Sequence, residues 1–321
     1  MVDVVACGEL LIDFTPVQQK EKLGSTVFEQ NPGGAPANVL VALSRFGKRT
    51  SFIGAVGNDV FGRFLQQTLI RQNIGTDGLV LTEEAPTTLA FVHLDETGDR
   101  SFHFYRNPGA DMMLREEDVN EALIAQAAIF HFGTLSLTHE PARSATWKAV
   151  AYAKKHQRLL SFDPNIRASL WADLEEAKVM TLKGMAQADI VKLSEEELAF
   201  LMGSEDVVEA TKSMLAQYDL QAVFVTLGEK GCFYRTQNQF GTVGGFPVTA
   251  VDTTGAGDAF VGALLNQLLE ARERMLDIPQ VKLEDMVRFA NAAGALTTTK
   301  TGAIPAMPTQ DEVKSFMEAA R

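Results

Sequence analysis

Short apolar runs rich in β-branched residues alternate along most of this chain with longer stretches in which apolar residues recur at helical spacing. The short runs, which predict strands, lie at 2–6, 51–56, 129–132, 159–162, 190–193 and 222–226. The helical stretches lie at 36–46, 60–72, 140–156, 173–187 and 195–202. Because parallel strands need crossover connections, which are usually helices, this alternation predicts an α/β fold with a mainly parallel sheet.

One part of the chain does not follow this alternation. Segments 87–94 and 101–106 flank a polar turn and predict an antiparallel hairpin, and residues 11–32 are also extended in character. We expect these segments to form a small β-sheet lid of residues 11–32 and 87–108. The large domain then comprises residues 1–10, 33–86 and 109–321. After a predicted strand at 246–251, the chain is expected to be mainly helical.

The charge balance excludes some classes of partner. The chain has 29 basic and 41 acidic side chains, a formal net charge of −12, which repels phosphate backbones and anionic membrane surfaces. The sequence contains no signal-peptide pattern and no run of about 18 apolar residues. The only two cysteines, Cys7 and Cys232, have no metal-binding spacing. We therefore expect a cytoplasmic protein without nucleic-acid or membrane partners.

The most informative motif is the segment 252–260, which reads DTTGAGDAF and leads into an apolar helix. Two glycines at a helix N-terminus expose unpaired backbone N–H groups at the positive end of the helix dipole, which suits a phosphate. Asp258 would repel that phosphate, but its position is explained if it takes a proton from an attacking hydroxyl group. The alternative is that Asp258 caps the helix and that the glycines form a tight turn.

A second glycine-containing segment, 31–38, also opens a helix. Gly33 and Gly34 leave room for a polyol, and Asn38 lies in the first turn of the helix, away from its apolar face. Asp13, after the first strand, can accept two hydroxyl hydrogen bonds. The alternative is an ordinary loop with an exposed asparagine.

Further candidate ligands follow other predicted strands. Asn165 and Arg167 lie just after the strand 159–162, where open α/β sheets place ligands, and Arg106 ends the predicted hairpin. Each arginine could equally form a surface salt bridge. The turn 226–231 suits backbone contact with a nucleotide or is a simple β-turn, and Ser194-Glu195-Glu196-Glu197 fits a helix capping box.

In this order, these elements resemble the PfkB, or ribokinase-like, family of carbohydrate kinases over nearly the whole chain. The stretch from Gly33 to Asp59 is similar to the N-terminal family signature, and 252–265 to the C-terminal one. The resemblance implies a three-layer α/β/α domain with a small β lid, and transfer of the γ-phosphoryl group of ATP to a sugar hydroxyl. It also implies that Asp258 is the catalytic base and that Gly255, Ala256 and Gly257 form the anion hole.

The resemblance assigns ligand contacts to further positions. The sugar contacts implied are Asp13, Gly33, Gly34, Asn38, Arg106, Asn165 and Arg167. The ATP contacts implied are Lys192, Ser194, Thr226, Gly228, Gly231 and Asn291. Glu197 would act on Mg²⁺ through water, and a monovalent cation such as K⁺ would lie at Asp252, Thr254, Thr297, Lys300 and Gly302. Ser194 replaces the Asn of the family's N-x-x-E motif, which puts that nucleotide contact in doubt.

Within the family, the stretches 104–112, 130–135 and 163–171 are similar to fructokinases. The D-x-N-x-R-x-x-L-W pattern is also similar to 2-keto-3-deoxygluconate kinases, whose substrate carries a carboxylate that an arginine would bind. A catalytically inactive sugar-sensing relative is the alternative from a different class, but Asp258, Gly255 and Gly257 are all present. The sequence therefore predicts an ATP-dependent fructokinase that forms a homodimer through its lid.

Overall fold

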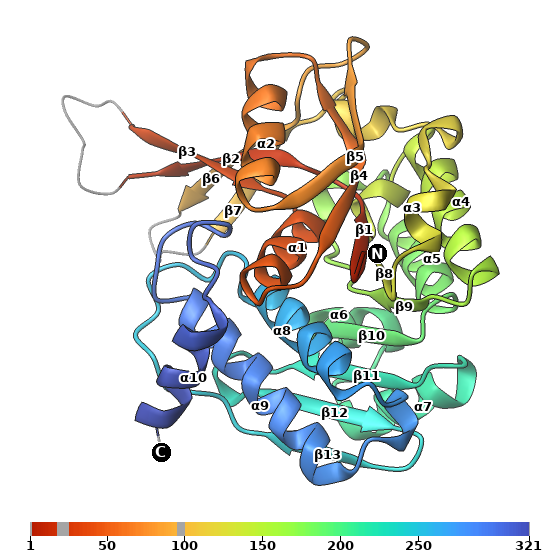
Figure 1. The fold of residues 1–321 in the computed structure, drawn as a ribbon, viewed down its shortest axis with the longest axis vertical. Helices are drawn as coiled ribbons and strands as arrows, with labels where there is room; N and C mark the ends of the chain where they lie inside the picture. Colours follow the sequence, from red (N-terminus) through yellow and green to blue (C-terminus); the bar gives the residue numbers. More distant parts are fainter. Residues whose placement is uncertain (1, 18–25, 95–99, 321) are drawn as a thin grey trace.

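The computed structural model describes residues 2–17, 26–94 and 100–320. Its centre is a large sheet with the strand order β13-β12-β11-β10-β9-β8-β1-β4-β5 (Figure 1). The strands are β1 (Val4–Cys7), β4 (Thr50–Gly57), β5 (Ile74–Thr82), β8 (Ile129–Phe132), β9 (Leu159–Phe162), β10 (Ile190–Ser194), β11 (Ala222–Thr226), β12 (Cys232–Thr236) and β13 (Phe240–Val243). All neighbours pair in parallel except β12, which is antiparallel to both β11 and β13.

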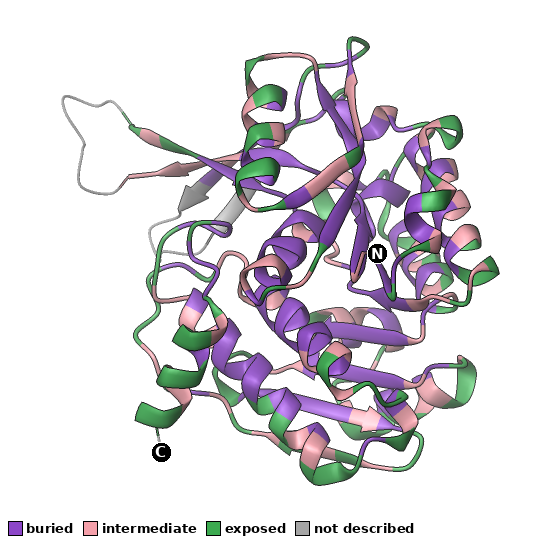
Figure 2. Ribbon diagram, in the orientation of Figure 1, coloured by how far each residue is buried: buried purple, intermediate pink, exposed green. Residues whose placement is uncertain are grey.

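Helices cover both faces of this sheet, which gives the three-layer α/β/α arrangement. They are α1 (Ala35–Arg45), α2 (Val60–Arg71), α3 (Glu121–Ala125), α4 (Ala142–Lys155), α5 (Leu174–Met185), α6 (Glu195–Met202), α7 (Val207–Gln217), α8 (Ala256–Ala271), α9 (Gln280–Thr297) and α10 (Gln310–Ala319). Alternate β1 side chains point to opposite faces: Val4 and Ala6 join a core with α1, α8 and α9, and Val5 and Cys7 join one with α3, α4, α6 and α7. Strands β1, β4 and β8 are correspondingly buried along their whole length in Figure 2, whereas the edge strand β13 is not.

Helices α1 and α8 pack closely although they lie far apart in the sequence. A Cβ atom placed on Gly262 would lie 2.6 Å from the Cβ of Ala42, so this contact requires glycine on α8. The close packing brings the N-terminal ends of both helices to the same edge of the sheet.

The small sheet contains β2 (Leu11–Pro16), β3 (Phe28–Gly33), β6 (Leu89–Leu94) and β7 (Arg100–Tyr105), in the order β3-β2-β6-β7. It projects from the large sheet, at the left of Figure 1. Its Phe14 stacks on Phe91 at 4.8 Å and contacts Phe61 of α2 edge-on at 6.0 Å, which anchors the sheet on the large domain. The predicted fold class is confirmed, including this separate small sheet.

The predicted strand at 246–251 is wrong: these residues pair with no strand of either described sheet, and α9 and the residue after it hold the two ends of the loop that contains them. Residues 244–250 are irregular. Asn291 of α9 donates from Nδ2 to the carbonyl oxygens of Val243 and Gly244, and the amides of Val251 and Asp252 both donate to the carbonyl of Thr298.

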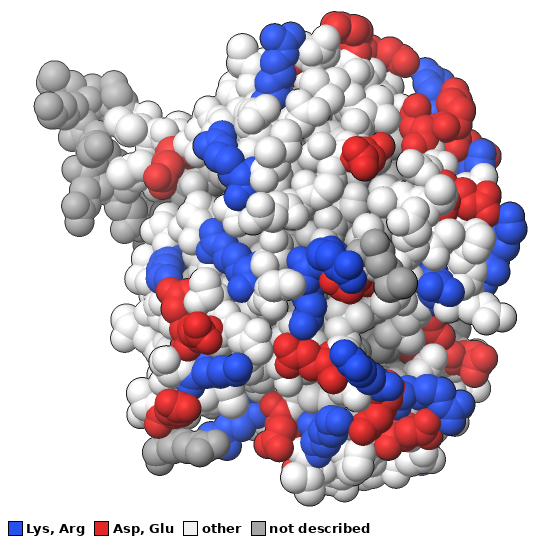
Figure 3. Space-filling model, in the orientation of Figure 1, with Lys and Arg blue, Asp and Glu red and all other residues white. Residues whose placement is uncertain are grey.

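Two surface properties complete the description. Basic and acidic side chains are interspersed over the described residues of the face in Figure 3. None of the helices in the described ranges has the length and apolar character needed to span a bilayer.

Candidate active site

A cavity of about 490 Å³ lies at the carboxyl ends of the parallel strands, next to the small sheet. The sequence predicted many of the residues that line it: Asp13, Gly34, Asn38, Asn165, Arg167, Lys192, Thr226, Thr254, Gly255, Gly257 and Asp258. The cavity is also lined by residues that were not predicted to belong to the site, namely Glu9, Leu11, Ala35, Phe104, Leu135 and Thr253. One cavity therefore joins both glycine-containing motifs, which lie at opposite ends of the chain.

The N-terminus of α8 forms one wall of this cavity. Gly255 adopts a left-handed conformation with φ of 80°, and a Cβ atom there would lie 2.9 Å from the Cβ of Ala303. Asp252 fixes the turn: its carboxylate accepts the amide of Thr254 at 2.8 Å and that of Gly302 at 2.9 Å. Because the first N–H groups of a helix lack partners within it, this wall provides donors suited to an anion.

Ala256 differs from its two glycine neighbours. Its amide donates to the carbonyl of Thr253 at 3.3 Å, and Ala256 is not among the described residues that line the cavity. Gly255 and Gly257 are thus the members of the predicted anion hole that border the cavity directly.

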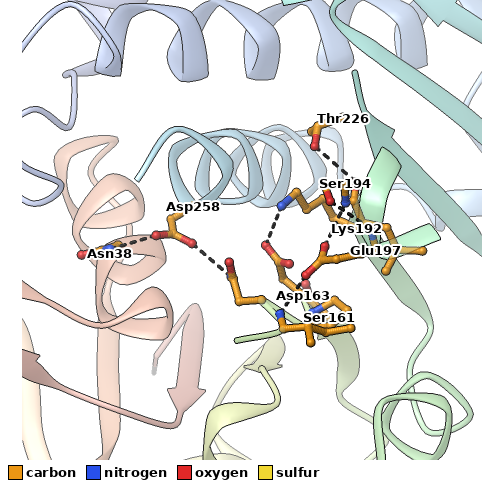
Figure 4. Close-up of polar contacts among 12 residues, drawn as sticks. Asn38, Ser161, Asp163, Lys192, Ser194, Glu197, Thr226 and Asp258 are labelled. Carbon is orange, nitrogen blue, oxygen red and sulfur yellow. Dashed lines mark hydrogen bonds and ion pairs between the residues drawn. The ribbon is translucent and has the colours of Figure 1, made fainter. Parts of the chain in front are cut away.

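Asp258 is buried and is held by two amide side chains from other parts of the chain (Figure 4). Its Oδ2 accepts Nδ2 of Asn38 at 2.8 Å, and its Oδ1 accepts Nδ2 of Asn165 at 3.4 Å. Burial raises the pKa of Asp258, an effect that Asn38 and the charges of Lys192 and Arg167 oppose. These partners are side chains and not backbone amides of α8, and Asp258 lines the cavity, which favours a base oriented toward the cavity over a helix cap.

A buried lysine lies against the same helix end. Lys192, on β10, forms an ion pair with Asp163 at 3.1 Å (Figure 4). A Cβ atom on Gly257 would lie 2.9 Å from Lys192 Nζ, so the ammonium group adjoins the anion-hole backbone. Burial lowers the pKa of Lys192, but the charges of Asp163, Glu197 and Asp258 outweigh this and raise it, so the lysine is a cation at neutral pH.

Two carboxyl groups lie in the part of the cavity next to the small sheet. Glu9 accepts the amide of Ala35 at 2.8 Å, which caps α1 where Gly34 has no side chain to do so. A Cβ atom on Gly33 would lie 2.1 Å from Oδ2 of Asp13, so only glycine leaves room for that carboxylate. Burial raises the pKa of both Glu9 and Asp13 to about 7.

Arg106, which was predicted to contact the sugar, has protein partners in the described structure, and the sugar contact stays a prediction. Arg106 is buried and is not among the described residues that line the cavity. Its guanidinium group forms an ion pair with Asp111 at 2.7 Å and also donates to Thr138 and to the Leu135 carbonyl. The guanidinium group that was predicted to contact the sugar thus bonds to other residues of the protein.

Ser194 and Glu197 form the predicted capping box of α6. The Ser194 hydroxyl accepts the amide of Glu197 at 3.1 Å, and Glu197 accepts the amide of Ser194 at 2.9 Å and that of Ile166 at 2.8 Å. The described residues contain no cluster of three or more His, Cys, Asp or Glu side chains that could hold a metal. Glu197 lies near Lys192 in Figure 4, and its charge is among those that raise the pKa of that lysine; its predicted contact with Mg²⁺ through water stays a prediction.

The remaining predicted nucleotide residues lie beyond Thr226, which donates to the Leu193 carbonyl at 3.2 Å. Gly228 and Gly231 have φ values of 58° and 102°. A Cβ atom on Gly231 would lie 2.1 Å from the Val243 carbonyl oxygen, so glycine is required there. Asn291 binds the loop after β13, as described above, and is not among the described residues that line the cavity.

The residues predicted to bind a monovalent cation surround the turn before α8. Asp252 bridges Thr254 and Gly302 through its carboxylate. Thr297 donates its hydroxyl to the Ala293 carbonyl at 2.8 Å, and Lys300 forms an exposed ion pair with Glu312 at 3.2 Å. Asp252, Thr254 and Gly302 are thus joined through the Asp252 carboxylate, whereas Thr297 and Lys300 are joined to each other, through the Lys300 amide and the Thr297 carbonyl at 3.3 Å.

The comparisons with known proteins agree with this geometry. The model of the pfkB family carbohydrate kinases matches residues 1–310. The chain is 47% identical over 316 residues to probable fructokinase-2 of Arabidopsis thaliana, covering 98% of this chain and 95% of that one. A fructokinase of Xylella fastidiosa with bound ATP has a TM-score of 0.91 and 36% identity, covering 99% of both chains. A fructokinase of Vibrio cholerae with bound fructose, ADP and calcium has a TM-score of 0.89 and 39% identity, covering 98% of this chain and 99% of that one.

A helix end that offers amide donors, a carboxylate beside it and a cavity next to a small sheet fit a kinase that acts on small molecules. The chain belongs to the pfkB family of carbohydrate kinases, and the family predicted from its two signatures is confirmed.

Proposed function

We propose that this protein transfers the γ-phosphoryl group of ATP to the primary hydroxyl group of fructose, forming fructose 6-phosphate. The main support is the position of Asp258, whose carboxylate borders the cavity beside the Gly255 and Gly257 backbone and is oriented by Asn38. Curated fructokinases of plants, which are 44–47% identical to this chain over nearly its whole length, support the choice of sugar.

In this proposal, Asp258 takes the proton of the attacking hydroxyl group as the new P–O bond forms. Little covalent work falls to the protein in phosphoryl transfer, so positioning and charge stabilisation dominate. The Gly255 and Gly257 backbone and Lys192 stabilise the charge of the moving phosphoryl group, and Asn38 and Asn165 hold the Asp258 carboxylate toward the sugar. Mg²⁺ on the ATP phosphates would neutralise part of their charge, with Glu197 acting on it through water.

The charges around the sugar end favour a neutral sugar over a sugar acid. Glu9 and Asp13 line this end. Arg167 is the cation whose charge acts on Asp13, and Asp111 neutralises Arg106. A substrate with its own carboxylate would face two carboxyl groups with one arginine to balance them. This observation supports fructose against 2-keto-3-deoxygluconate.

We further propose that the small sheet formed by β2, β3, β6 and β7 closes over the sugar and excludes water, which would otherwise accept the phosphoryl group. Of the predicted lid segments 11–32 and 87–108, residues 18–25 and 95–99 lie outside the described residues. Homodimer formation through this sheet, a requirement for K⁺ at Asp252, Thr254 and Gly302, and a cytoplasmic location remain predictions. Size-exclusion chromatography with light scattering tests the first of these, and titration with KCl tests the second.

A coupled assay of ADP release with a panel of sugars tests the main proposal, and mass spectrometry identifies the product. We expect turnover with fructose and none with 2-keto-3-deoxygluconate. Turnover with 2-keto-3-deoxygluconate but not with fructose would instead support a 2-keto-3-deoxygluconate kinase. Sugar binding without turnover on any substrate would support an inactive sensor.

A further inference from the structure

A buried ion pair lies where the hairpin β6–β7 joins the large domain. Arg106 directly follows β7, and Asp111 lies in the short helical turn Ala110–Met113. Arg106 Nη2 and Nε lie 2.7 Å and 2.8 Å from Asp111 Oδ2, with 3% and 1% of the two side chains exposed. The guanidinium group thus contacts the carboxylate through two nitrogens, which fixes its orientation as well as its distance.

The same carboxylate holds the other strand of the hairpin. Thr88, one residue before β6, donates its hydroxyl to Oδ1 of Asp111. A Cβ atom on Gly109 would lie 1.9 Å from Oγ1 of Thr88 and 2.8 Å from Cγ of Arg106, so glycine is required for these groups to approach. Asp111 therefore fixes both chain segments through which the hairpin leaves the large domain.

The rest of the guanidinium group connects this junction to the cavity. Arg106 Nη1 donates to Oγ1 of Thr138 at 2.9 Å, and Nη2 donates to the carbonyl of Leu135 at 3.1 Å. Leu135 lines the cavity, as does Phe104, two residues before Arg106 on β7. One side chain thus joins the hairpin to a turn that borders the proposed sugar.

A buried ion pair is weak evidence for a role in stability, because packed apolar side chains of similar volume often stabilise a fold as well or better. A charged pair with fixed hydrogen-bond partners does, however, favour one relative arrangement of the segments that it joins. At this place in the fold, that arrangement is the angle between the hairpin and the large domain.

We propose that Arg106 is a positioning residue for phosphoryl transfer, which it serves by fixing the hairpin β6–β7 over the sugar end of the cavity. The inference rests on the proposed function. With the hairpin in place, the γ-phosphoryl group leaves ADP and bonds to the sugar oxygen, and the hydroxyl proton is released. With the hairpin loosened, water enters, and the same P–O cleavage then yields ADP, inorganic phosphate and a proton.

The test compares Arg106→Lys with the wild-type protein, measuring ADP and fructose 6-phosphate in the same reaction. Lysine keeps the charge beside Asp111 but lacks the planar fork that also reaches Leu135 and Thr138. We expect the ratio of ADP to sugar phosphate to rise from one to about two or more. The KM for fructose should rise about tenfold, and the KM for ATP should stay within about twofold.

Arg143→Lys is the matched control. Arg143 binds the same turn from another side, through the carbonyls of Leu137 at 2.7 Å and Thr138 at 2.8 Å, and its ion pair is with Glu176 on α5. This variant should keep the ratio at one. A second test variant, Thr88→Val, removes only the hydroxyl bond to Asp111 and should move the ratio in the same direction as Arg106→Lys, by less.

The possible outcomes separate this inference from the proposed function. A raised KM for fructose with a ratio of one in Arg106→Lys would indicate a direct sugar contact and overturn the positioning role. An equal rise of the ratio in Arg143→Lys would also overturn it, because any loosening of the turn would then suffice. If wild-type protein fails to phosphorylate fructose, the proposed function itself fails, and the positioning role fails with it.

Discussion

Replacing Asp258 with asparagine separates proton transfer from substrate binding. The amide has nearly the shape of the carboxylate, and its oxygen can still accept the hydrogen bond that Asn38 donates at 2.8 Å, while the longer bond from Asn165 at 3.4 Å is lost. The buried position already penalises the charged form of Asp258, so the neutral amide should not destabilise the fold. Asp258→Asn should therefore bind ATP and fructose nearly as well as the wild-type protein does, within about threefold, and lose mainly kcat.

The expected loss follows from the role of the residue. A positioned general base contributes about 10²–10⁴ in rate, which corresponds to about 3–5 kcal/mol of activation free energy. The contribution should lie toward the upper end, because Asn38 and Asn165 orient the carboxylate and the cavity is lined by a preformed helix end. Steady-state kcat from the coupled ADP assay measures this loss.

The pH profile gives an independent check. The base must be ionised, so wild-type kcat should fall as the pH drops through the pKa of Asp258, which burial raises above its ordinary value of 3.8. Asp258→Asn should lack this acidic limb. The control is Asp206→Asn, an exposed cap of α7, which should leave kcat unchanged. A kcat in Asp258→Asn within threefold of the wild-type value would refute the assignment of the base.

Three further substitutions test the division of the cavity. Lys192→Met should lower kcat by about 10² and raise the KM for ATP more than the KM for fructose. Equal rises of both KM values in steady-state kinetics would contradict the placement of Lys192 at the ATP end of the cavity. Arg167→Ala should raise the KM for fructose about tenfold and change the KM for ATP little. A larger rise in the KM for ATP would instead assign Arg167 to the ATP end of the cavity. Glu9→Gln should raise the free energy of unfolding at pH 8 by up to about 3 kcal/mol, since the pKa of Glu9 lies near 7 against 4.5 when exposed. This gain should shrink toward zero at pH 5, where the Glu9 carboxyl group of the folded wild-type protein is mostly protonated. Urea unfolding at the two pH values measures the gain, and an equal gain at both would contradict the raised pKa of Glu9.

The sequence predicted six adjacent strands of the large sheet, β4, β1 and β8 to β11, because they are apolar runs that are mostly buried on both faces. The outer strands β5, β12 and β13 were not predicted, and β5 and β13 are only partly buried. The strands predicted at 129–132, 159–162 and 222–226 have the same bounds as β8, β9 and β11. The predicted strand at 246–251 had a similar composition. The ends of the loop that contains it bond instead to Asn291 and Thr298, which lie much later in the chain and which no local pattern reveals.

The candidate site could be predicted where a short motif determines the backbone conformation. It could not be predicted where a side chain can bond either to a ligand or to another residue of the protein. Gly255 and Asp258 belong to one short turn, so their mutual placement followed from the sequence. Arg106 looked available for a ligand, yet Asp111, only five positions further along, neutralises it. Glu9 was missed, although one signal existed: a carboxylate directly after the first strand, near a helix that begins at a glycine.

The contact between Asn38 and Asp258 joins residues that are 220 positions apart, and the helices that carry them pack through Gly262. Ribosomes add about 5–20 residues per second, so about 10–40 s separate the synthesis of the two helices. During that time the apolar face of α1 has no α8 to cover it. We therefore expect nascent chains of this protein to depend on chaperones that shield this early helix until the last third of the polypeptide has emerged.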